Sequence, residues 1–515
     1  MTQSIYPAYP PDLTEEQANF LLTNLKDWSI ARGLAVRPAP SFISASQDPS
    51  GVLATTAPVT LFPSLFPRHC FDEGFAIQKA YNELYAAIAQ DEEWLKSIVE
   101  ELLEVDDFVA KLWQVHVDVK EEGYAQDLTL GLFRSDYMVH VDPSESDAKP
   151  QIKQVEFNTI ASSFGGLSTQ VSALHKYLLS IDAYPAELES VIKQDLLPHS
   201  QSVPSLAAGL AAAHSAYGPS RSSNPLCVLF VVQDPERNVF DQRHLEYSLF
   251  ADHGVRSFRV PFSKVLSYTK LDSDRNLIYT PPHVSGKSYE VTTIYYRAGY
   301  SPDDFPTNAE WAARLHLERS RAIKCPSILL QLAGCKKVQQ VLATPQSPHL
   351  AHFLPDGTTS ARVLKTFAPI YPMDKSEAGL EARKLATNPE TAQRYVLKPQ
   401  REGGGNNIYR GAIPPFLSKL PESHWPAYIL MEMIEPPAQN NVILRNGEVQ
   451  KGGVICELGV YGVCLWKNGA GTGSPGQILV NREAGYLLRT KGNQSEEGGV
   501  AAGFGAVDSC CLVET

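Results

Sequence analysis

Hydrophobic residues recur at helical spacing along the first third of the chain. Over residues 18–28 an apolar residue returns every three or four positions, which predicts an amphipathic helix. Thr14 and Gln17 precede this helix with the spacing of a capping box. The same spacing predicts two further helices, over residues 73–89 and 91–113.

Polar and apolar residues alternate from Ile152 to Asn158, which predicts a strand, and small residues at 162–166 predict a turn directly after it. Glu156 and Asn158 are two residues apart on this strand and therefore point to the same side. Their oxygens are of the kind that Mg²⁺ prefers. A Glu-x-Asn pair on a strand is usually only an exposed polar face, so the surroundings of this pair decide whether it is a metal site.

A composition break at residues 218–225, which are rich in Ser, Pro and Gly, separates the first part of the chain from a second. The continuous apolar run from Leu226 to Val232 predicts a buried strand. The elements expected after it are a helix over 241–252, strands over 255–260 and 292–296, and a helix over 311–322. This alternation is typical of a parallel α/β sheet.

The last third begins with a predicted helix from Lys336 to Leu342. We expect a loop over 345–360, strands over 395–398 and 428–431, and glycine-rich loops in the tail. The division of the chain that follows is 1–220, 225–335 and 336–515. The fold class is α/β, in a mixed α+β arrangement.

Three consecutive glycines, Gly403 to Gly405, follow the predicted strand that ends at Lys398. Such a turn lets successive backbone N–H groups approach one another, a geometry suited to phosphate oxygens. Neither a GxGxxG motif nor a Walker A motif fits the segment. Most glycine-rich turns only satisfy unusual dihedral angles, and here the flanking Lys398 and Glu402 favour phosphate binding.

Composition places the chain among folded globular proteins. It has 515 residues, 43% hydrophobic and 20% charged, which argues against a disordered chain and against a membrane protein. Its formal net charge of −12 supplies no general attraction for nucleic acid or an anionic membrane, so we expect neither as a partner. Residues 1–11 lack the pattern of a signal peptide, and a cytoplasmic location is expected.

The eight cysteines include no CxxC pair, which argues against a zinc ribbon. We expect them to be reduced and mostly buried as small apolar residues.

Several blocks of sequence resemble the eukaryotic-type glutathione synthetases. The clearest are Val155–Ile160, Lys398–Tyr409 and Leu488–Lys491. Further matching blocks occur in the same order at 130–138, 235–243, 296–300, 331–338 and 498–503. The resemblance implies an ATP-grasp-like core with an inserted α/β substrate-binding domain and a glycine-rich lid. It also implies a homodimer that uses ATP and Mg²⁺ to join γ-glutamylcysteine to glycine through an acyl phosphate.

The resemblance assigns roles to individual residues. The implied Mg²⁺ ligands are Glu156, Asn158 and Glu402. The implied nucleotide contacts are Glu156, Lys336, Lys398, Pro399, Gln400, Arg401, Glu402, Gly403, Gly404, Gly405, Asn406, Asn407, Tyr409, Met431, Glu432, Met433, Ile434, Glu457, Lys491 and Glu497. The implied contacts to the dipeptide, glycine or product are Arg134, Ile160, Ala161, Ser162, Ser163, Glu236, Arg237, Asn238, Gln242, Arg297, Ala298, Gly299, Tyr300, Arg489, Val500 and Ala501.

Three of these residues are the implied catalytic groups. Lys336 and Lys398 would offset the repulsion between a carboxylate and the γ-phosphate. Arg489 would hold the glycine carboxylate or stabilise the developing oxyanion, and the sequence leaves both roles open. The small pair Ala501–Ala502 favours glycine as acceptor over β-alanine.

Three positions depart from the pattern of animal glutathione synthetases. Ala161 stands where those enzymes have Ser, Ala298 where they have Asp, and Met433 where they have Lys. The first two departures remove a hydroxyl and a carboxylate near the implied dipeptide site.

Other functions are compatible with parts of the sequence. One alternative is a homoglutathione-type or other ATP-dependent carboxylate–amine ligase, and another is a non-catalytic ATP-binding regulatory protein. One set of residues argues against loss of catalysis when taken together: Glu156, Asn158, Lys336, Lys398, Glu402 and Arg489. A dinucleotide-binding oxidoreductase is improbable, because no GxGxxG motif follows the apolar run at 226–232.

Overall fold

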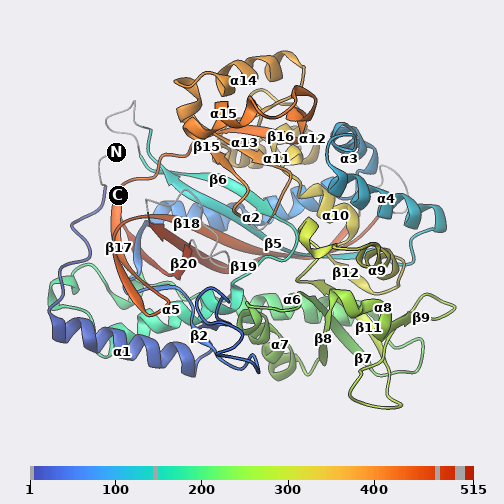
Figure 1. Cartoon of the computed structure of the whole chain (residues 1–515), viewed down its shortest axis with the longest axis horizontal. Coiled ribbons are helices and arrows are strands. Elements are labelled where there is room, and N and C mark those ends of the chain that lie inside the picture. Colours follow the sequence, from blue (N-terminus) through green and yellow to red (C-terminus); the bar gives the residue numbers. More distant parts are fainter. Residues whose placement is uncertain (1–4, 143–148, 403, 470–475, 493–504) are drawn as a thin grey trace.

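The computed structural model describes residues 5–142, 149–402, 404–469, 476–492 and 505–515. In Figure 1 a large twisted sheet crosses the middle of the molecule, helices flank it, and a smaller group of strands and helices lies on top of it. The mixed α/β fold class predicted from the sequence is confirmed.

The large sheet has 13 strands. Along its main path these are β17 (Gln439–Arg445), β3 (Val59–Thr60), β20 (Gly505–Asp508), β19 (Gln477–Gly492), β18 (Glu448–Lys467), β5 (Leu128–His140), β12 (Ile323–Cys325), β11 (Tyr289–Tyr296), β10 (Leu277–Tyr279) and β9 (Thr269–Leu271). Beside this path lie β6 (Gln151–Asn158), which pairs with β5, β7 (Leu226–Val232), which pairs with β11, and β8 (Ser257–Pro261), which pairs with β7. Two further pairs of short strands are β1 (Ala35–Val36) with β2 (Thr55–Thr56) and β4 (Ser64–Pro67) with β21 (Cys510–Val513).

The helices are short to medium in length. They are α1 (Glu15–Ala31), α2 (Arg68–Ile88), α3 (Glu92–Val99), α4 (Asp107–Glu122), α5 (Gly165–Ser180), α6 (Ser202–Tyr217), α7 (Val239–His253), α8 (Val265–Tyr268), α9 (Asn308–Glu318), α10 (Ile328–Ala333), α11 (Lys336–Ala343), α12 (His349–Phe353), α13 (Gly357–Thr366), α14 (Glu377–Thr387) and α15 (Ile413–Leu417). The capping box predicted at the start of α1 is present, with Thr14 and Gln17 each bonding to the other's backbone N–H.

Strand β5 is the branch point of the large sheet. One edge of β5 pairs with β18 along its whole length. The other edge pairs in parallel with β12 at Thr129 and in antiparallel with β6 from Arg134 onward. The sheet therefore branches beside Arg134, where β6 replaces β12 as the neighbour of β5.

Two hydrophobic cores lie on the two faces of this sheet, as expected when successive side chains of a strand point to opposite faces. On one face α2 packs against β18 at Gly74, where an added Cβ would lie 3.3 Å from Val460. On the other face α6 packs at Gly209, where a Cβ would lie 2.8 Å from Val463.

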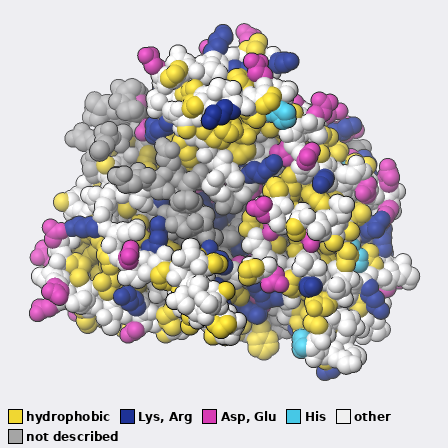
Figure 2. All heavy atoms as spheres, in the orientation of Figure 1, with side chains coloured by type: hydrophobic (Ala, Val, Ile, Leu, Met, Phe, Trp, Pro, Cys, Tyr) yellow, Lys and Arg dark blue, Asp and Glu magenta, His cyan; other side chains and the backbone are white. Residues whose placement is uncertain are grey.

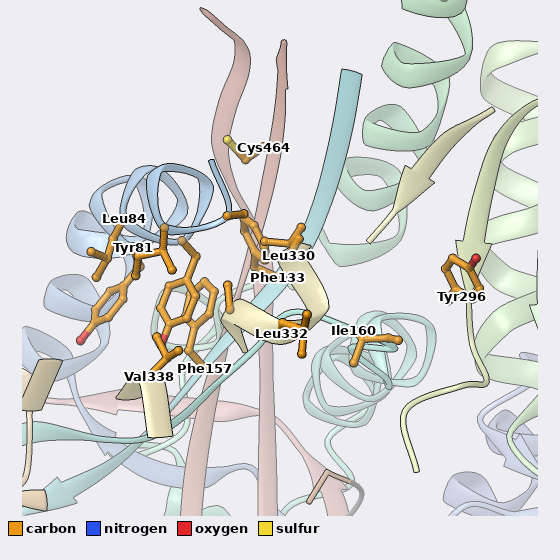
Figure 3. Close-up of a cluster of buried hydrophobic side chains, with 14 of the residues drawn as sticks. Tyr81, Leu84, Phe133, Phe157, Ile160, Tyr296, Leu330, Leu332, Val338 and Cys464 are labelled. Carbon is orange, nitrogen blue, oxygen red and sulfur yellow. The ribbon is translucent and has the colours of Figure 1, made fainter. Parts of the chain in front are cut away.

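Phe157 fastens β6 to the first of these cores. Its ring stacks on Tyr85 with centroids 3.9 Å apart and an interplanar angle of 11°. It also contacts Phe133 at 5.1 Å and Tyr81 at 5.7 Å, and Figure 3 shows Phe157 beside Val338 of α11. Because Phe157 points into the core, its neighbours Glu156 and Asn158 must point to the other face.

A β-bulge in β6 adjusts this alternation. Asp136 of β5 pairs with Glu156, but Tyr137 pairs with Gln154, so Val155 is the extra residue. The bulge lets both Val155 and Glu156 face the cavity, while Gln154 is fully buried.

The small sheet forms a cap with a core of its own. Its strands, in order, are β13 (Ile370–Pro372), β16 (Tyr428–Glu432), β14 (Tyr395–Pro399) and β15 (Ile408–Tyr409), all antiparallel. Tyr395 and Leu397 pack with residues of α14 and α15. Val396 and Lys398 alternate with them and line the cavity instead, so β14 joins the cap core to the site.

The expected parallel α/β stretch is confirmed. The apolar run from Leu226 to Val232 is β7, which pairs in parallel with β8 and β11, and β11 pairs in parallel with β12. Helices α7 and α9 connect these strands as expected. Through the pairing of β12 with β5, this stretch continues the large sheet and does not form a sheet of its own.

Three local predictions are wrong. The single helix expected over 91–113 is divided into α3, a 3₁₀ turn at Glu100–Leu102 and α4, because Asp106 caps a new helix by accepting hydrogen bonds from the backbone N–H groups of Phe108 and Val109. The loop expected over 345–360 contains α12 and the start of α13. The tail expected to consist of glycine-rich loops contains the two longest strands, β18 and β19.

Acidic and basic side chains are interspersed over the face shown in Figure 2. Among the described residues, no helix combines the length and apolar character needed to cross a bilayer. All eight cysteines lie in the described ranges and none forms a disulfide; seven are buried and Cys335 is partly buried, as expected.

One buried carboxyl group generates a prediction on stability. Asp508 is fully buried, and burial raises its pKa to about 6, although hydrogen bonds from the hydroxyls of Ser64 and Thr490 oppose this effect. Because the folded state holds this proton more tightly than the unfolded state, stability should fall as the pH rises from about 3.8 to about 6, by about 3 kcal/mol.

The Asp508→Asn variant has no carboxyl group at this position and should therefore not lose this stability as the pH rises. The melting temperature of the variant relative to the parent should therefore rise between pH 4.5 and pH 7. A constant difference between the two proteins over this range would contradict the assignment.

Candidate active site

A cavity of about 350 Å³ lies between the branch of the large sheet and the cap. Strands β5, β6, β18 and β19 contribute residues from the large sheet, and β14 and β16 contribute residues from the cap. The glycine turn after β14, the first residue of α11 and the segments that follow β6 and β16 also contribute to its wall.

Lys336, at the start of α11, joins the two carboxylates that the sequence placed far apart. Its Nζ donates hydrogen bonds of 2.9 Å to Glu156 Oε2 and of 2.9 Å to Glu402 Oε1. Lys336 is buried, which by itself would lower its pKa, but the two carboxylates outweigh burial and raise the pKa. The ammonium group therefore stays charged between them.

The two carboxylates differ in their electrostatic surroundings. Burial would raise the pKa of Glu156, but the positive charges of Lys336, Lys398 and Arg489 outweigh burial and lower the pKa. For Glu402, burial dominates over the attraction of Lys336 and raises the pKa to about 7. Glu156 is thus a permanent anion, whereas the charge of Glu402 depends on what binds beside it.

Lys398 supplies a second cation whose charge responds to its surroundings. Burial lowers its pKa to about 8, and the nearby Glu156 opposes this effect. Its Nζ donates a hydrogen bond of 3.0 Å to the carbonyl oxygen of Val155, the bulged residue of β6. An anionic ligand in the cavity would favour the charged form of this lysine.

Arg489 closes the end of the cavity on β19. Its Nη2 donates to Asp136 Oδ2 at 2.9 Å and to Glu457 Oε1. Glu457 and Arg489 are directly paired across β18 and β19. Arg134 of β5 also binds Asp136, with distances of 2.6 and 2.8 Å. Two arginines thus share one buried carboxylate at this end.

The donor atoms around Glu156 fit a magnesium ion only in part. Asn158 Nδ2 donates to Arg134 O at 3.1 Å and to Asp136 Oδ2 at 2.9 Å, which leaves Asn158 Oδ1 as the free ligand atom. In the described part of the chain no three His, Cys, Asp or Glu side chains converge as a metal cage. Because Mg²⁺ is usually held by one or two carboxylates together with phosphate oxygens and waters, Glu156, Glu402 and Asn158 fit an ion that arrives with a phosphate ligand.

The glycine turn is anchored at its base by Arg401. The Nη1 atom of Arg401 donates to Asp106 Oδ2 at 2.5 Å, so that Asp106 joins the turn to the N-terminus of α4. Gly404 and Gly405 have φ of 76° and 81°, values that side chains disfavour. The turn therefore needs glycine at these positions.

Most of the residues selected from the sequence meet at the cavity. Those that line it are Arg134, Glu156, Asn158, Ile160, Ala161, Ser163, Tyr300, Lys336, Lys398, Arg401, Glu402, Gly404, Asn406, Asn407, Tyr409, Met431, Glu432, Met433, Ile434, Glu457, Arg489 and Lys491. Those described but outside its lining are Pro399, Gln400, Gly405, Ser162, Glu236, Arg237, Asn238, Gln242, Arg297, Ala298 and Gly299. Gly403, Glu497, Val500 and Ala501 lie outside the described residues.

Several of the residues outside the lining adjoin the cavity through Ser163. Arg297 donates to Ser163 Oγ at 2.7 Å and to Ser162 O at 3.0 Å. Glu236 accepts hydrogen bonds from the backbone N–H of Asn238 and the amide of Gln242. Among the described residues, Asn238 Oδ1, Gln242 Oε1 and Arg297 Nε are buried without a hydrogen-bond partner. Unpaired buried polar atoms are costly to a folded protein.

Sequence reasoning missed part of the cavity wall. Met138, Val155, Phe164, Val396, Arg410, Pro436 and Ile455 also line it. Val396 could have been found, because it shares a face of its strand with Lys398. Asp136 was also missed as a functional residue, although it lies between Arg134 and Met138 in a block that resembles the glutathione synthetases.

Fold and cavity together define an ATP-grasp-like protein, in which a strand-borne lysine and a glycine turn face carboxylates across a cleft. The family model for the eukaryotic glutathione synthase, ATP-binding domain, matches residues 15–512. The chain belongs to the eukaryotic glutathione synthase family.

Individual relatives agree with this assignment. The glutathione synthetase large chain of Schizosaccharomyces pombe is 39% identical over 97% of this chain and 99% of its own. The glutathione synthetase of Homo sapiens is 38% identical over 96% of this chain and 97% of its own. Among solved structures, a glutathione synthetase-like effector from Globodera pallida, in its apo form, aligns with a TM-score of 0.73 over 99% of this chain and all of that one. At 20% identity this last likeness concerns the fold alone.

Two adjacent lysines allow a matched test of the cation at the centre of the cavity. Lys336→Met removes the charge between Glu156 and Glu402, and we expect ATP affinity to fall about 100-fold, because two facing carboxylates would then repel each other and the phosphates. Isothermal titration calorimetry with Mg²⁺–ATP measures this change.

The control is Lys337→Met. Lys337 is equally buried, but its Nζ pairs with Glu101 and Asp374 outside the cavity. This variant should lose thermal stability and retain ATP affinity. Equal losses of affinity in the two variants would show that Lys336 acts through folding alone.

Proposed function

We propose that this protein is a glutathione synthetase, which ligates γ-L-glutamyl-L-cysteine to glycine and converts ATP to ADP and phosphate. Membership of the eukaryotic glutathione synthase family supports the proposal. The observation that carries it is the contact of Lys336 with both Glu156 and Glu402 inside the cavity. In the proposed reaction, this cation and the two carboxylates would face the phosphates of a bound nucleoside triphosphate.

The first chemical step is the attack of the cysteinyl carboxylate on the γ-phosphorus. A bond forms between the carboxylate oxygen and phosphorus, the bond to the β–γ bridging oxygen breaks, and ADP leaves. Both reactants are anionic, so the charges of Lys336 and Lys398 reduce their repulsion and stabilise the transferring phosphoryl group. Mg²⁺, held by Glu156, Asn158 and Glu402 when it is bound, would polarise and partly neutralise the phosphates.

In the second step the glycine amine attacks the acyl carbon, phosphate leaves, and the amine loses a proton. Arg489 is the cation at this end of the cavity, and its Nη2 is held by Asp136 and Glu457. We propose that Arg489 faces glycine, either holding its carboxylate or stabilising the oxyanion.

The γ-glutamylcysteine site would lie beside the cavity, around Ser163 and Arg297. The unpaired Asn238 Oδ1, Gln242 Oε1 and Arg297 Nε support this location, because a zwitterionic dipeptide would satisfy them. Asn238, Gln242 and Arg297 all belong to residues 225–335, which we propose as the substrate-binding part of the chain. Ala298 has no polar group in its side chain, so polar contacts at this position would come from the backbone.

Water must be excluded for an acyl phosphate to survive until glycine attacks it. We propose that the glycine turn acts as a lid, since Gly404 and Gly405 give it backbone freedom and Arg401 fixes its base. The proposed glycine contacts at Val500 and Ala501 complete the acceptor site, and the small pair Ala501–Ala502 favours glycine over β-alanine.

ADP release tests the proposed reaction. Purified protein with ATP, Mg²⁺ and γ-glutamylcysteine should release ADP at least about tenfold faster when glycine is added, because the acyl phosphate is consumed only by the amine. A coupled pyruvate kinase and lactate dehydrogenase assay measures the rate, and mass spectrometry identifies glutathione.

The same assay separates the alternatives. Faster turnover with β-alanine or serine than with glycine would indicate a homoglutathione-type ligase. ATP binding without any ADP release would indicate a non-catalytic regulatory protein.

We also propose that the protein is a homodimer in the cytoplasm. Tyr247 and Phe250 lie one turn apart on α7 with 63% and 71% of their surface exposed. Large aromatic side chains exposed side by side are typical of protein interfaces. This face of α7 is therefore the proposed contact between subunits.

The double substitution of Tyr247→Glu and Phe250→Glu should convert a dimer into a monomer, because it places like charges in an apolar contact. Size-exclusion chromatography with light scattering should show the mass falling by half. Leu380→Glu, at an exposed position on α14 of the cap, is the control and should leave the mass unchanged. A parent protein with the mass of one chain would contradict the dimer, and a dimer in the double variant would exclude this face.

A further inference from the structure

Asp136 occupies the centre of the candidate active site although no role has been assigned to it. It lies on β5 with none of its surface exposed. Across the sheet it is paired with Glu156 of β6 on one side and with Gly459 of β18 on the other. Asp136 therefore lies between β6, which carries the proposed metal ligands Glu156 and Asn158, and β18, which carries Glu457.

The carboxylate of Asp136 accepts hydrogen bonds from three residues of the site. Arg134 donates from Nε to Oδ1 at 2.6 Å and from Nη2 to Oδ2 at 2.8 Å. Asn158 Nδ2 and Arg489 Nη2 each donate to Oδ2 at 2.9 Å. The buried carboxylate of Asp136 thus touches three residues with different proposed roles. Arg134 is a proposed dipeptide contact, Asn158 a proposed metal ligand and Arg489 a proposed glycine contact.

These bonds fix the orientation of the Asn158 amide. Both hydrogens of Asn158 Nδ2 are used, one by Arg134 O and one by Asp136 Oδ2. An amide flipped by 180° would place Oδ1 against two acceptors and would be repelled. Asp136 therefore ensures that oxygen, and not nitrogen, is the atom that Asn158 presents to a cation.

Asp136 also allows two arginines to lie close together. Arg134 and Arg489 carry the same charge and bind the same carboxylate. Without that anion their guanidinium groups would repel each other and separate. The hydrogen bonds from Arg489 to described residues all use Nη2, so Asp136 and Glu457 hold one side of the guanidinium group and leave the other side for a ligand.

Gly459 makes room for this arrangement. A Cβ at position 459 would lie 2.7 Å from Arg134 Cδ and 2.8 Å from Asp136 Oδ1, too close for either atom. The strand next to β5 therefore lacks a side chain where the pair of Arg134 and Asp136 crosses it. This absence offers a way to displace the pair without changing any charge.

We propose that Asp136 is a positioning residue, which sets the amide of Asn158 for the cation and the guanidinium group of Arg489 for the acceptor substrate. The inference rests on the proposed function for the identity of the substrates, but the orientation of Asn158 is independent of it. Groups that orient a metal ligand typically change metal affinity 10- to 100-fold when they are replaced.

Two variants test the proposal. Asp136→Asn removes the charge and replaces one acceptor by a donor, and Gly459→Ala displaces the pair sterically. In both, calorimetry should show that the Mg²⁺ concentration needed for half-maximal ATP binding rises by about tenfold or more, while ATP binding without Mg²⁺ stays within about twofold of the parent. The KM for glycine should rise in both, because Arg489 loses its support.

Glu290→Gln is the matched control. Glu290 is likewise fully buried and accepts hydrogen bonds from Tyr217, Ser220 and Ser222, but it lies at the start of β11, at the far end of that strand from Arg297. This variant should lower the melting temperature and leave the Mg²⁺ requirement of ATP binding unchanged. It therefore reports what loss of a buried carboxylate does to stability alone.

The outcomes distinguish this proposal from the proposed function. If the parent releases no ADP, the proposed function fails, and Mg²⁺-dependent ATP binding still tests Asp136. If the parent makes glutathione and both variants keep its Mg²⁺ requirement, the role of Asp136 is overturned and the function stands. Should Asp136→Asn fail to fold, Gly459→Ala alone decides, since it retains every charged group.

Discussion

The structure depends on the contact of one buried ammonium group with two carboxylates from distant parts of the chain. Lys336 begins α11, Glu156 lies in the last part of β6 of the large sheet, and Glu402 follows β14 of the cap. Removing one member of a buried ion pair typically costs about 3–5 kcal/mol, because the remaining charge is left uncompensated. Helix α11, the large sheet and the cap must therefore keep relative positions in which both hydrogen bonds of Lys336 can form. The same charges that hold them together are those that a nucleotide would bind.

The sheet provides the opening that this cluster needs. Because β5 pairs with β12 at one end and with β6 at the other, the large sheet splits beside Arg134. The bulge at Val155 then turns two consecutive residues of β6 toward the opening, while Phe157 fixes the strand in the core behind it.

The sequence allowed prediction of features that depend on local spacing. The run of apolar residues at 226–232 corresponds to β7, and the two-residue spacing of Glu156 and Asn158 placed both on the cavity face. The break between α3 and α4 was missed, because the helical spacing of apolar residues continues across the break. The new helix begins at the side chain of Asp106, which caps α4. Strands β18 and β19 were missed because their glycines suggested loops. At Gly459 the lack of a side chain instead leaves room for Arg134 and Asp136 of the neighbouring strand. The convergence of Glu156, Lys336 and Glu402 depends on long-range packing, and only the resemblance to a known family indicated it.

The cap combines a core of its own with a second apolar face that packs against the body. Tyr395 and Leu397 on one face of β14 belong to the separate cap core, whereas Val396 and Lys398 on the other face line the cavity. Arg401 ties the base of the glycine turn to α4, and Lys337 links the 3₁₀ turn at Glu100–Leu102 and the cap through Glu101 and Asp374. The other face of the cap sheet is apolar as well, because Ile370 and Ile429 belong to the main core together with Val338 of α11. A movement of the whole cap would expose these residues to water, so the apolar contact holds the cap on the body, while ligand binding acts on the charged contacts across the cavity.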